Sequence, residues 1–178
     1  MQASRLTLPF AIRPSVEADA SAMLEIYRPF VETSTVSFEL NTPSIEVFQS
    51  RIAKVRSGWQ WLVAERGHKI LGYAYGSLHR ERPAYQWSVE VSAYVDPDQH
   101  RQGIGRALYL QLFEELGSRG FCNAYAGVTL PNDASVGLHT SVGFSRIGEF
   151  ARVGHKFGRW HDVAWFQREL RSSPRDGK

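Results

Sequence analysis

A short glycine-containing segment, His100-Arg101-Gln102-Gly103-Ile104-Gly105-Arg106, holds the residue types and spacing that point most clearly to chemistry. Two glycines let a bulky ligand approach the backbone without meeting a Cβ atom. A helix that begins directly after them points unpaired N–H groups and the positive end of its dipole at such a ligand. Arg101 and Arg106 add two positive charges. The segment therefore predicts an anion cradle suited to a pyrophosphate.

Two better-known glycine motifs fit this segment poorly. A nucleotide P-loop needs Lys-Ser or Lys-Thr after its last glycine, and no such pair follows Gly105. The dinucleotide fingerprint needs a third glycine or an alanine where this sequence has Leu108. A plain turn that only connects a strand to a helix remains an alternative at this point.

The flanking sequence predicts the elements that position the cradle. Ser88 to Val95 has the alternation of a strand, and apolar residues at every fourth position from Ile104 to Leu116 indicate a helix. Other strands are expected at 10–13, 59–65, 69–78, 124–128, 148–157 and 163–170. Other helices are expected at 18–31, at 43–56 behind an N-cap at Thr42, and at 133–142 behind an N-cap at Asn132. Mixed strands and helices predict one α/β domain over residues 10–170, with an N-terminal tail at 1–9 and a polar C-terminal tail at 171–178.

Length and composition support a single folded domain. The 178 residues are 43% hydrophobic and 22% charged, which is typical of globular proteins and excludes wholesale disorder. Cys122 is the one cysteine, so an intrachain disulfide and a cysteine-based zinc finger are excluded. No apolar run approaches the ~20 residues of a membrane span. The first residues contain no long apolar segment of the signal-peptide kind. A cytoplasmic protein is therefore expected.

The charge pattern argues against some partners. The net charge is +3 and the pI about 9.2, which suits an acidic ligand. The basic residues are scattered rather than clustered on one helix, so a nucleic-acid partner is not expected. His155 and His161 lack the spacing of metal ligands, and no metal is expected.

Two segments together resemble the acetyl-CoA segments of the GNAT superfamily of N-acetyltransferases. Gly103 and Gly105 fill the glycine positions of that family's [Q/R]-x-x-G-x-[G/A] loop, and Tyr94-Val95-Asp96-Pro97 matches the preceding strand end. Downstream, Leu130-Pro131-Asn132-Asp133 and then Val142-Gly143-Phe144 match the second segment. Two segments in the correct order and spacing are far more specific than either one alone.

The resemblance covers nearly the whole chain and implies a fold, a donor and a binding site. The implied fold is a single-domain α/β GNAT fold, with a mixed central sheet, a splayed strand pair and flanking helices. Acetyl-CoA would be the acetyl donor. Its thioester arm would lie along Ala93, Tyr94 and Val95, with Asn132 beside it. Its pyrophosphate would be held by the main chain and side chains of Arg101, Gln102, Gly103, Ile104, Gly105 and Arg106.

Within the superfamily the sequence is most similar to the phosphinothricin and methionine sulfoximine acetyltransferases. The similarity lies in Ala84-Tyr85-x-Trp87-x-x-Glu90 and in the run Lys156-Phe157-Gly158-x-Trp160-His161-Asp162-Val163. It implies acetylation of the amine of a small amino acid or analogue by a homodimer. The second run would lie near the substrate end and the dimer contact. Ordinary core and turn residues are the alternative interpretation of that run.

Two residues are candidates for the chemistry. Glu90 lies near the thioester end of its strand, where a carboxylate can take the amine proton directly or through water. His139 lies four residues before Gly143, where many GNAT enzymes have a tyrosine, and it could assist as a base or orient Glu90. An isolated strand glutamate is more often a surface residue, and a lone helix histidine is more often packed.

The acceptor site needs cations if the substrate is acidic. Arg80 and Arg82 offer planar forks for a carboxylate or phosphinate, although solvated loop charge is an equally good interpretation. Phe38, Tyr75 and Tyr85 are the other expected acceptor residues. Acetylation of another amine, such as a protein N-terminus or a polyamine, stays an alternative, and so does a CoA-binding module without catalysis.

Overall fold

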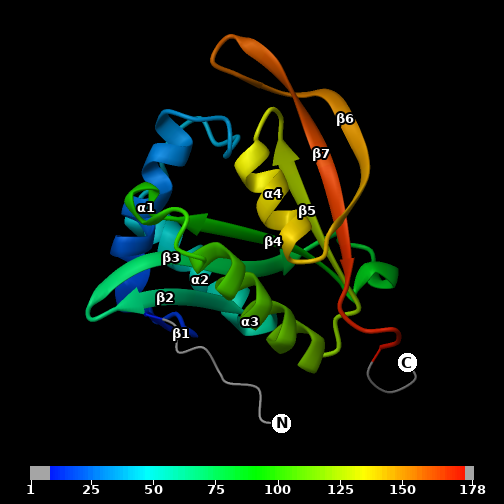
Figure 1. Ribbon diagram of the computed structural model, residues 1–178, viewed down its shortest axis with the longest axis horizontal. Coiled ribbons are helices and arrows are strands. Elements are labelled where there is room, and N and C mark those ends of the chain that lie inside the picture. The colour runs from blue at the N-terminus through cyan, green and yellow to red at the C-terminus, as the bar shows by residue number, and fades with distance from the viewer. Residues whose placement is uncertain (1–8, 175–178) are drawn as a thin grey trace.

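The computed structural model describes residues 9–174. Within that range seven strands form one sheet in the order β1-β2-β3-β4-β5-β7-β6 (Figure 1). Only β4 and β5 run parallel, so the sheet is mixed, as predicted. The strands are β1 Ala11–Pro14, β2 Trp61–Arg66, β3 Lys69–Leu78, β4 Ser88–Val95, β5 Asn123–Thr129, β6 Ser145–Lys156 and β7 Arg159–Glu169.

Four α-helices in the described range cover the two faces of this sheet. They are α1 Ala20–Glu32, α2 Ile45–Gly58, α3 Ile104–Ser118 and α4 Asp133–Ser141. The predicted stripe of Leu108, Leu112 and Leu116 buries α3 against one face, where α4 also packs. On the other face α1 and α2 enclose a second core around Trp61 and Tyr73 (Figure 1). The result is a three-layer α/β arrangement.

Several predicted element boundaries were off by a few residues, such as the start of β6 at Ser145 rather than 148, and two of them have a clear cause. Ser44, not Thr42, is the N-cap of α2, because the Ser44 side chain accepts a hydrogen bond from the Val47 N–H, at 3.4 Å. The Thr42 hydroxyl instead donates to Glu32, at 2.9 Å. The last strand begins at Arg159 rather than at 163, because Phe157 and Gly158 form a tight turn with positive φ at both residues, which extends the hairpin.

The ends of the chain add little. The predicted tail 1–9 lies outside the described residues except for its last residue, and the predicted tail 171–178 does so beyond residue 174. Between these limits no helix combines the length and the apolar character needed to cross a bilayer.

The pairing of β4 changes halfway along the strand. Its residues 88–90 pair with residues 123–125 of β5, and from Val91 onward the two strands part. The second half of β4, through Val95, stays paired with β3 alone. Main-chain groups of this half therefore face a gap on the β5 side. This confirms the splayed strand pair expected from the resemblance.

Candidate active site

The predicted anion cradle lies at the open end of the splayed strands. Gly103 is the N-cap of α3 with φ of 77°, and Arg101 also has a positive φ, of 61°. No side chain in the described part of the chain caps this helix, so its first-turn N–H groups are left for a ligand. Arg101 and Arg106 are exposed, and neither has an ion-pair partner within residues 9–174. Open amides and two free cations fit a pyrophosphate.

Two side chains of the loop hold it to its surroundings. The Nε2 atom of His100 lies 3.1 Å from the carbonyl oxygen of Val95, to which it donates. Gln102 accepts from Arg66 at 2.9 Å and donates to Gln99 at 3.2 Å. These contacts fix the loop against the end of β4 and the β2–β3 turn. Gln102 can therefore serve a phosphate through its main chain while its side chain is engaged elsewhere.

Gly103→Ala is expected to weaken acetyl-CoA binding about tenfold, equivalent to ~1.4 kcal/mol. A Cβ atom at this position meets no protein atom within 4 Å, so its steric effect falls on a ligand in the cradle. The positive φ adds backbone strain of about 1–2 kcal/mol. Gly67→Ala is the matched control, because Gly67 has φ of 62° and equally open surroundings. Calorimetric titration with acetyl-CoA checks the prediction, and equal affinities for the two variants would contradict it.

The second predicted segment lies beside the first. The Asn132 side chain accepts from the Ser135 N–H at 3.0 Å and caps α4, as expected. A Cβ atom on Gly105 would lie 3.1 Å from Leu138 and 3.6 Å from Val95. The glycine thus permits the close approach of α3, α4 and the free half of β4. The tertiary structure brings the two segments to one end of the sheet.

Glu90 occupies the last paired position of β4, where β5 begins to diverge. Its neighbours Val89 and Val91 are buried on the α3 side, so the Glu90 side chain faces the α1–α2 side. It is 33% exposed, and its carboxylate lies 3.0 Å from Nδ1 of His79. The carboxylate is therefore held next to the splay and remains accessible.

His79 is a site residue that the sequence analysis missed. Its ring stacks on Tyr125 at 4.5 Å and meets Tyr85 edge-on at 5.7 Å. It follows the end of β3, whose Ser77 is the register partner of Glu90. Strand alternation places positions 77 and 79 on the same face, but only the register between β3 and β4 places that face beside Glu90. The register between β3 and β4 could not be predicted from the sequence alone.

His139 lies on the other side of the sheet from Glu90. It is 5% exposed and packs against Phe144 and Phe166 in the α3-side core. Its Nδ1 lies 2.7 Å from the Ser135 carbonyl oxygen, which can only accept, so Nδ1 carries the proton. Its Nε2 then accepts from the Tyr109 hydroxyl, at 3.1 Å. Burial lowers the pKa of His139 and favours this neutral ring. The structure does not bring His139 and Glu90 together.

The expected acceptor residues form two groups. Arg80, Arg82 and Tyr85 line one cavity of about 590 Å³ together with His79, which links this cavity to Glu90. Both arginines are exposed, and no acidic side chain within residues 9–174 forms an ion pair with either of them. Free cations in a concave site are what an acidic substrate group requires.

The second group comprises Tyr75 and Phe38. Tyr75 stacks on Trp61 at 4.2 Å, and burial raises the pKa of its hydroxyl, with Glu39 and Glu90 adding to the rise. Tyr75 therefore lies within electrostatic reach of both carboxylates. Phe38 precedes Glu39 in the loop after α1 and is 38% exposed. The loop and Glu90 thus approach the same face of the sheet.

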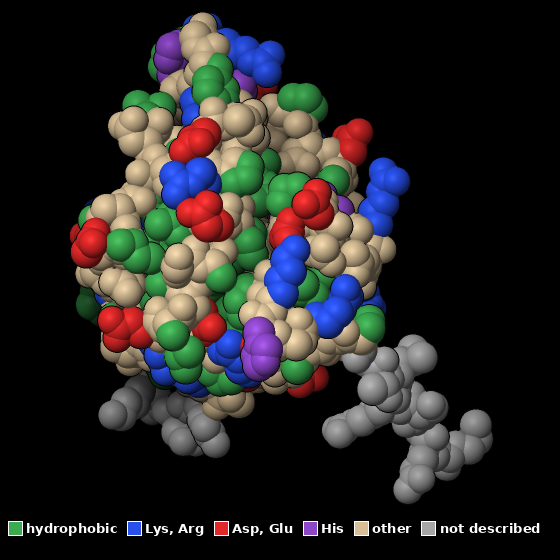
Figure 2. All heavy atoms as spheres, turned by 90° about the vertical axis from the view of Figure 1, so that its left-hand side faces the viewer, with side chains coloured by type: hydrophobic (Ala, Val, Ile, Leu, Met, Phe, Trp, Pro, Cys, Tyr) green, Lys and Arg blue, Asp and Glu red, His purple; other side chains and the backbone are tan. Residues whose placement is uncertain are grey.

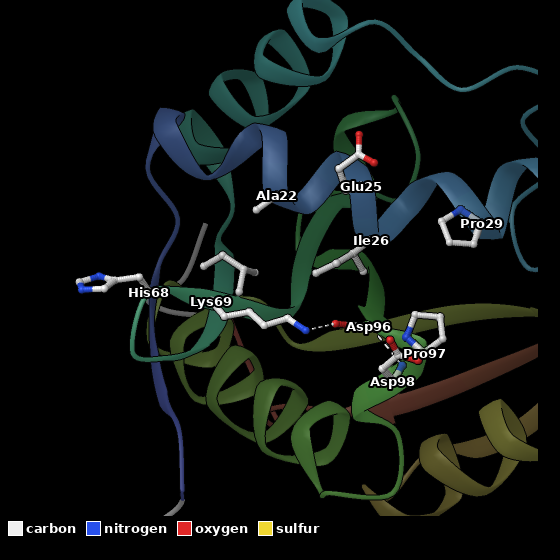
Figure 3. A pocket seen from close by; sticks show the side chains of 10 residues that line it. Ala22, Glu25, Ile26, Pro29, His68, Lys69, Asp96, Pro97 and Asp98 are labelled. Atoms are coloured by element: carbon white, nitrogen blue, oxygen red, sulfur yellow. Dashed lines mark hydrogen bonds and ion pairs between the residues drawn. The ribbon is translucent and has the colours of Figure 1, made fainter.

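A larger cavity, of about 770 Å³, lies elsewhere. Figure 2 shows hydrophobic side chains in a hollow between acidic and basic ones, and Figure 3 shows the lining residues. Lys69 and Asp96 form an ion pair at 2.9 Å on its wall. The lining consists of Ala22, Glu25, Ile26, Pro29, His68, Lys69, Ile70, Asp96, Pro97 and Asp98. None of the predicted site residues is among them, and the described part of the chain has no metal-binding group of His, Cys, Asp and Glu.

Parting parallel strands with an amide-lined anion cradle at the open end and a carboxylate at the closed end define a class of protein. Splayed strands of this kind, with a main-chain anion cradle beside them, suit an acyl-CoA thioester. Residues 12–165 match the acetyltransferase (GNAT) domain, and the chain belongs to this family of N-acetyltransferases. Acetyl-CoA is the acetyl donor.

Individual relatives agree with this assignment. The chain is 37% identical to the phosphinothricin N-acetyltransferase of Streptomyces viridochromogenes, over 94% of this chain and 92% of the relative. It is 34% identical to the L-methionine sulfoximine/L-methionine sulfone acetyltransferase of Pseudomonas paraeruginosa, over 92% and 98%. The crystal structure of a GNAT phosphinothricin acetyltransferase from Sinorhizobium meliloti in complex with acetyl-CoA superposes with a TM-score of 0.90. It is 32% identical and covers 96% of this chain and 95% of that one.

Proposed function

We propose that the protein transfers the acetyl group of acetyl-CoA to the amine of a small amino acid or analogue, of the phosphinothricin or methionine sulfoximine type. The observation that carries the proposal is the position of Glu90. It stands where β4 and β5 part, and His79 connects it to a cavity with two free arginines. The substrates named for the relatives support the same class of acceptor.

The chemistry assigned to this chain begins with the amine. A free α-amino group has a pKa of ~7.7–8.0 in model peptides, so a base must take its proton before it can attack. Glu90 is assigned as that base, directly or through one water. The amine nitrogen then bonds to the thioester carbonyl carbon, and the carbon–sulfur bond breaks. CoA leaves as a thiolate with the bonding electron pair, and the proton that the amide nitrogen loses reaches it through solvent. Main-chain N–H groups on the free half of β4, residues 91–95, are assigned to bind the thioester arm.

His79 is assigned to hold Glu90 in place. His79→Phe keeps an aromatic ring against Tyr125 and removes the donor, so we expect kcat to fall about tenfold, which is equivalent to ~1.4 kcal/mol. His79→Asn keeps an N–H near the position of Nδ1 and should stay within about threefold of the wild type, since the hydrogen bond is retained. Steady-state kinetics of both variants checks this. A loss in His79→Asn that His79→Phe does not share would attribute the effect to ring stacking and not to the hydrogen bond.

For His139 we propose a supporting role through Tyr109. Both ring nitrogens are engaged, with Ser135 and Tyr109, so the ring holds α4 to α3 behind the splayed strands. His139→Asn is expected to lower the free energy of unfolding by about 1–3 kcal/mol, because it leaves the buried Tyr109 hydroxyl without its acceptor. Denaturant unfolding measures this. A large loss of kcat at an unchanged free energy of unfolding would instead indicate that His139 takes part in catalysis.

A panel of amines tests the proposed function directly. The protein is incubated with acetyl-CoA and phosphinothricin, methionine sulfoximine, neutral amino acids, a polyamine or an N-terminal peptide, while free thiol is followed. We expect the fastest release with phosphinothricin or methionine sulfoximine. Faster release with the peptide or polyamine would favour another GNAT acceptor. Binding of acetyl-CoA without thiol release from any amine would indicate a CoA-binding module.

We also propose a homodimer that uses the β6–β7 hairpin. Five apolar side chains there are 49% to 57% exposed, namely Ile147, Phe150, Val153, Phe157 and Trp160. Several large exposed apolar side chains on one hairpin support a protein–protein contact. Light scattering that finds only monomer would overturn this proposal.

A cytoplasmic location remains a prediction from the sequence, as does the domain assigned to residues 10–170.

A further inference from the structure

The tip of the β6–β7 hairpin contains a buried lysine that plays no part in the chemistry assigned above. Lys156 ends β6 and is 3% exposed. Its Nζ donates to the carbonyl oxygens of Val31, Ser34 and Ser37, at 2.6, 2.9 and 2.8 Å. An ammonium group has three donors, so this group is fully used. All three acceptors belong to the end of α1 and the loop that follows it.

The chemistry of this contact explains why a lysine is tolerated there. Burial lowers the pKa of Lys156, and the nearby Glu39 carboxylate opposes that shift. The last carbonyls of a helix carry partial negative charge, so a cation at the end of α1 is favourable. A buried charge is retained only when it is hydrogen-bonded in this way. The lysine thus ties the hairpin to a loop more than a hundred residues away in sequence.

The same hairpin also contacts Phe38, a residue of the loop that follows α1. A Cβ atom on Gly154 would collide with the Phe38 ring, so only glycine permits this approach. Phe38 also lies 6.2 Å, centroid to centroid, from the ring of His161. The Nε2 of His161 donates to the carbonyl oxygen of Lys156, at 3.0 Å. Figure 1 shows the hairpin projecting from the body of the molecule, with its tip above the end of α1. Figure 2 shows basic and histidine side chains gathered at that tip.

The loop has a second attachment on the side of α1. The Tyr27 hydroxyl lies 2.6 Å from the Ser37 hydroxyl and donates to Glu39, at 3.1 Å. These bonds fix the side chains of the loop, whereas Lys156 binds its main chain. The main-chain conformation of the loop sets the direction in which the Phe38 side chain points. Loss of the lysine therefore frees the loop where Phe38 is attached.

We propose that Lys156 is a positioning residue, which orders residues 34–39 so that Phe38 stands as a wall of the acceptor site. The inference rests on the proposed function, since it treats the Phe38 side of the sheet as the acceptor side. We expect Lys156 to act on the acceptor alone, because the cradle residues 101–106 form no hydrogen bond with Lys156 or with residues 34–39 in the described part of the chain. Gly154 provides the space for the Phe38 ring, and Lys156 fixes the backbone of the loop to which Phe38 belongs.

Lys156→Met tests the proposal by removing the charge and the donors at nearly constant length. We expect amide hydrogen exchange across residues 33–40 to rise at least tenfold. We also expect the KM for the acceptor to rise at least tenfold, with the KM for acetyl-CoA within twofold of wild type. Lys54→Met, an exposed lysine of α2, is the matched control and should change neither quantity. Unchanged exchange across 33–40, or a parallel rise in both KM values, would overturn the proposal.

Gly154→Ala provides an independent arm if Lys156→Met does not fold. It keeps the lysine and displaces the Phe38 ring, so the acceptor KM should again rise alone, and an unchanged value would overturn the inference. The exchange measurement needs no substrate. It therefore decides whether Lys156 orders the loop even if the wild-type protein acetylates none of the amines tested, in which case the proposed function alone has failed.

Discussion

Glu90→Gln is expected to lower kcat about 100-fold or more, with little change in acetyl-CoA affinity. General-base catalysis typically contributes a factor of ~10²–10⁴, and a neutral amide cannot accept the amine proton. Glutamine keeps the size of the side chain and an oxygen that can accept from His79 Nδ1, so the local packing is preserved. The cradle predicted for the pyrophosphate follows the far end of β4 and is untouched.

Two measurements separate this effect from general damage. Thiol release under saturating acetyl-CoA gives kcat, and calorimetric titration gives the affinity for the donor. Glu114→Gln is the control, because Glu114 is exposed on α3 and remote from the splayed strands. A Glu90→Gln enzyme with kcat within about threefold of wild type would remove Glu90 from the role of base.

Replacing both Arg80 and Arg82 with alanine is expected to raise the KM for an acidic acceptor about 100-fold. A hydrogen bond to a charged group contributes ~1.5–3 kcal/mol, and two such bonds account for a loss of this order even when partly screened by solvent. The KM for acetyl-CoA should stay within about twofold, since neither arginine touches the cradle. The selectivity for phosphinothricin over leucine should fall with the affinity, because leucine has no acidic side-chain group to lose.

Conservative variants sharpen this test. Lysine at both positions keeps the charge but loses the planar fork, so the KM should fall between wild type and the double alanine variant. Arg119→Ala removes an exposed arginine beyond the end of α3 and should leave acceptor kinetics unchanged. If the double alanine variant keeps both its acceptor KM and its selectivity, the two arginines are solvated loop charge, the alternative that their sequence left open.

Much of the fold could be predicted because it depends on short-range patterns. The leucines at every fourth position place α3, and strand alternation places β4. The errors came at boundaries where neighbouring residues compete for one role. Ser44 and Thr42 are both good N-caps, and the contact of Thr42 with Glu32 is invisible in local sequence. The start of β7 was placed too late in the sequence, because a positive φ is unusual for phenylalanine and the turn at Phe157 could not be expected from its residue type.

The sequence by itself determined the donor end of this protein. A glycine loop before a helix binds an anion with its own main chain, so Gly103 and Gly105 carry the signal within a few residues. The tertiary structure decided how the predicted acceptor-side residues are arranged. It placed His79 beside Glu90, put His139 on the far side of the sheet, and anchored the loop of Phe38 through Lys156. Those contacts depend on strand register and on side chains from distant segments, which no local pattern encodes.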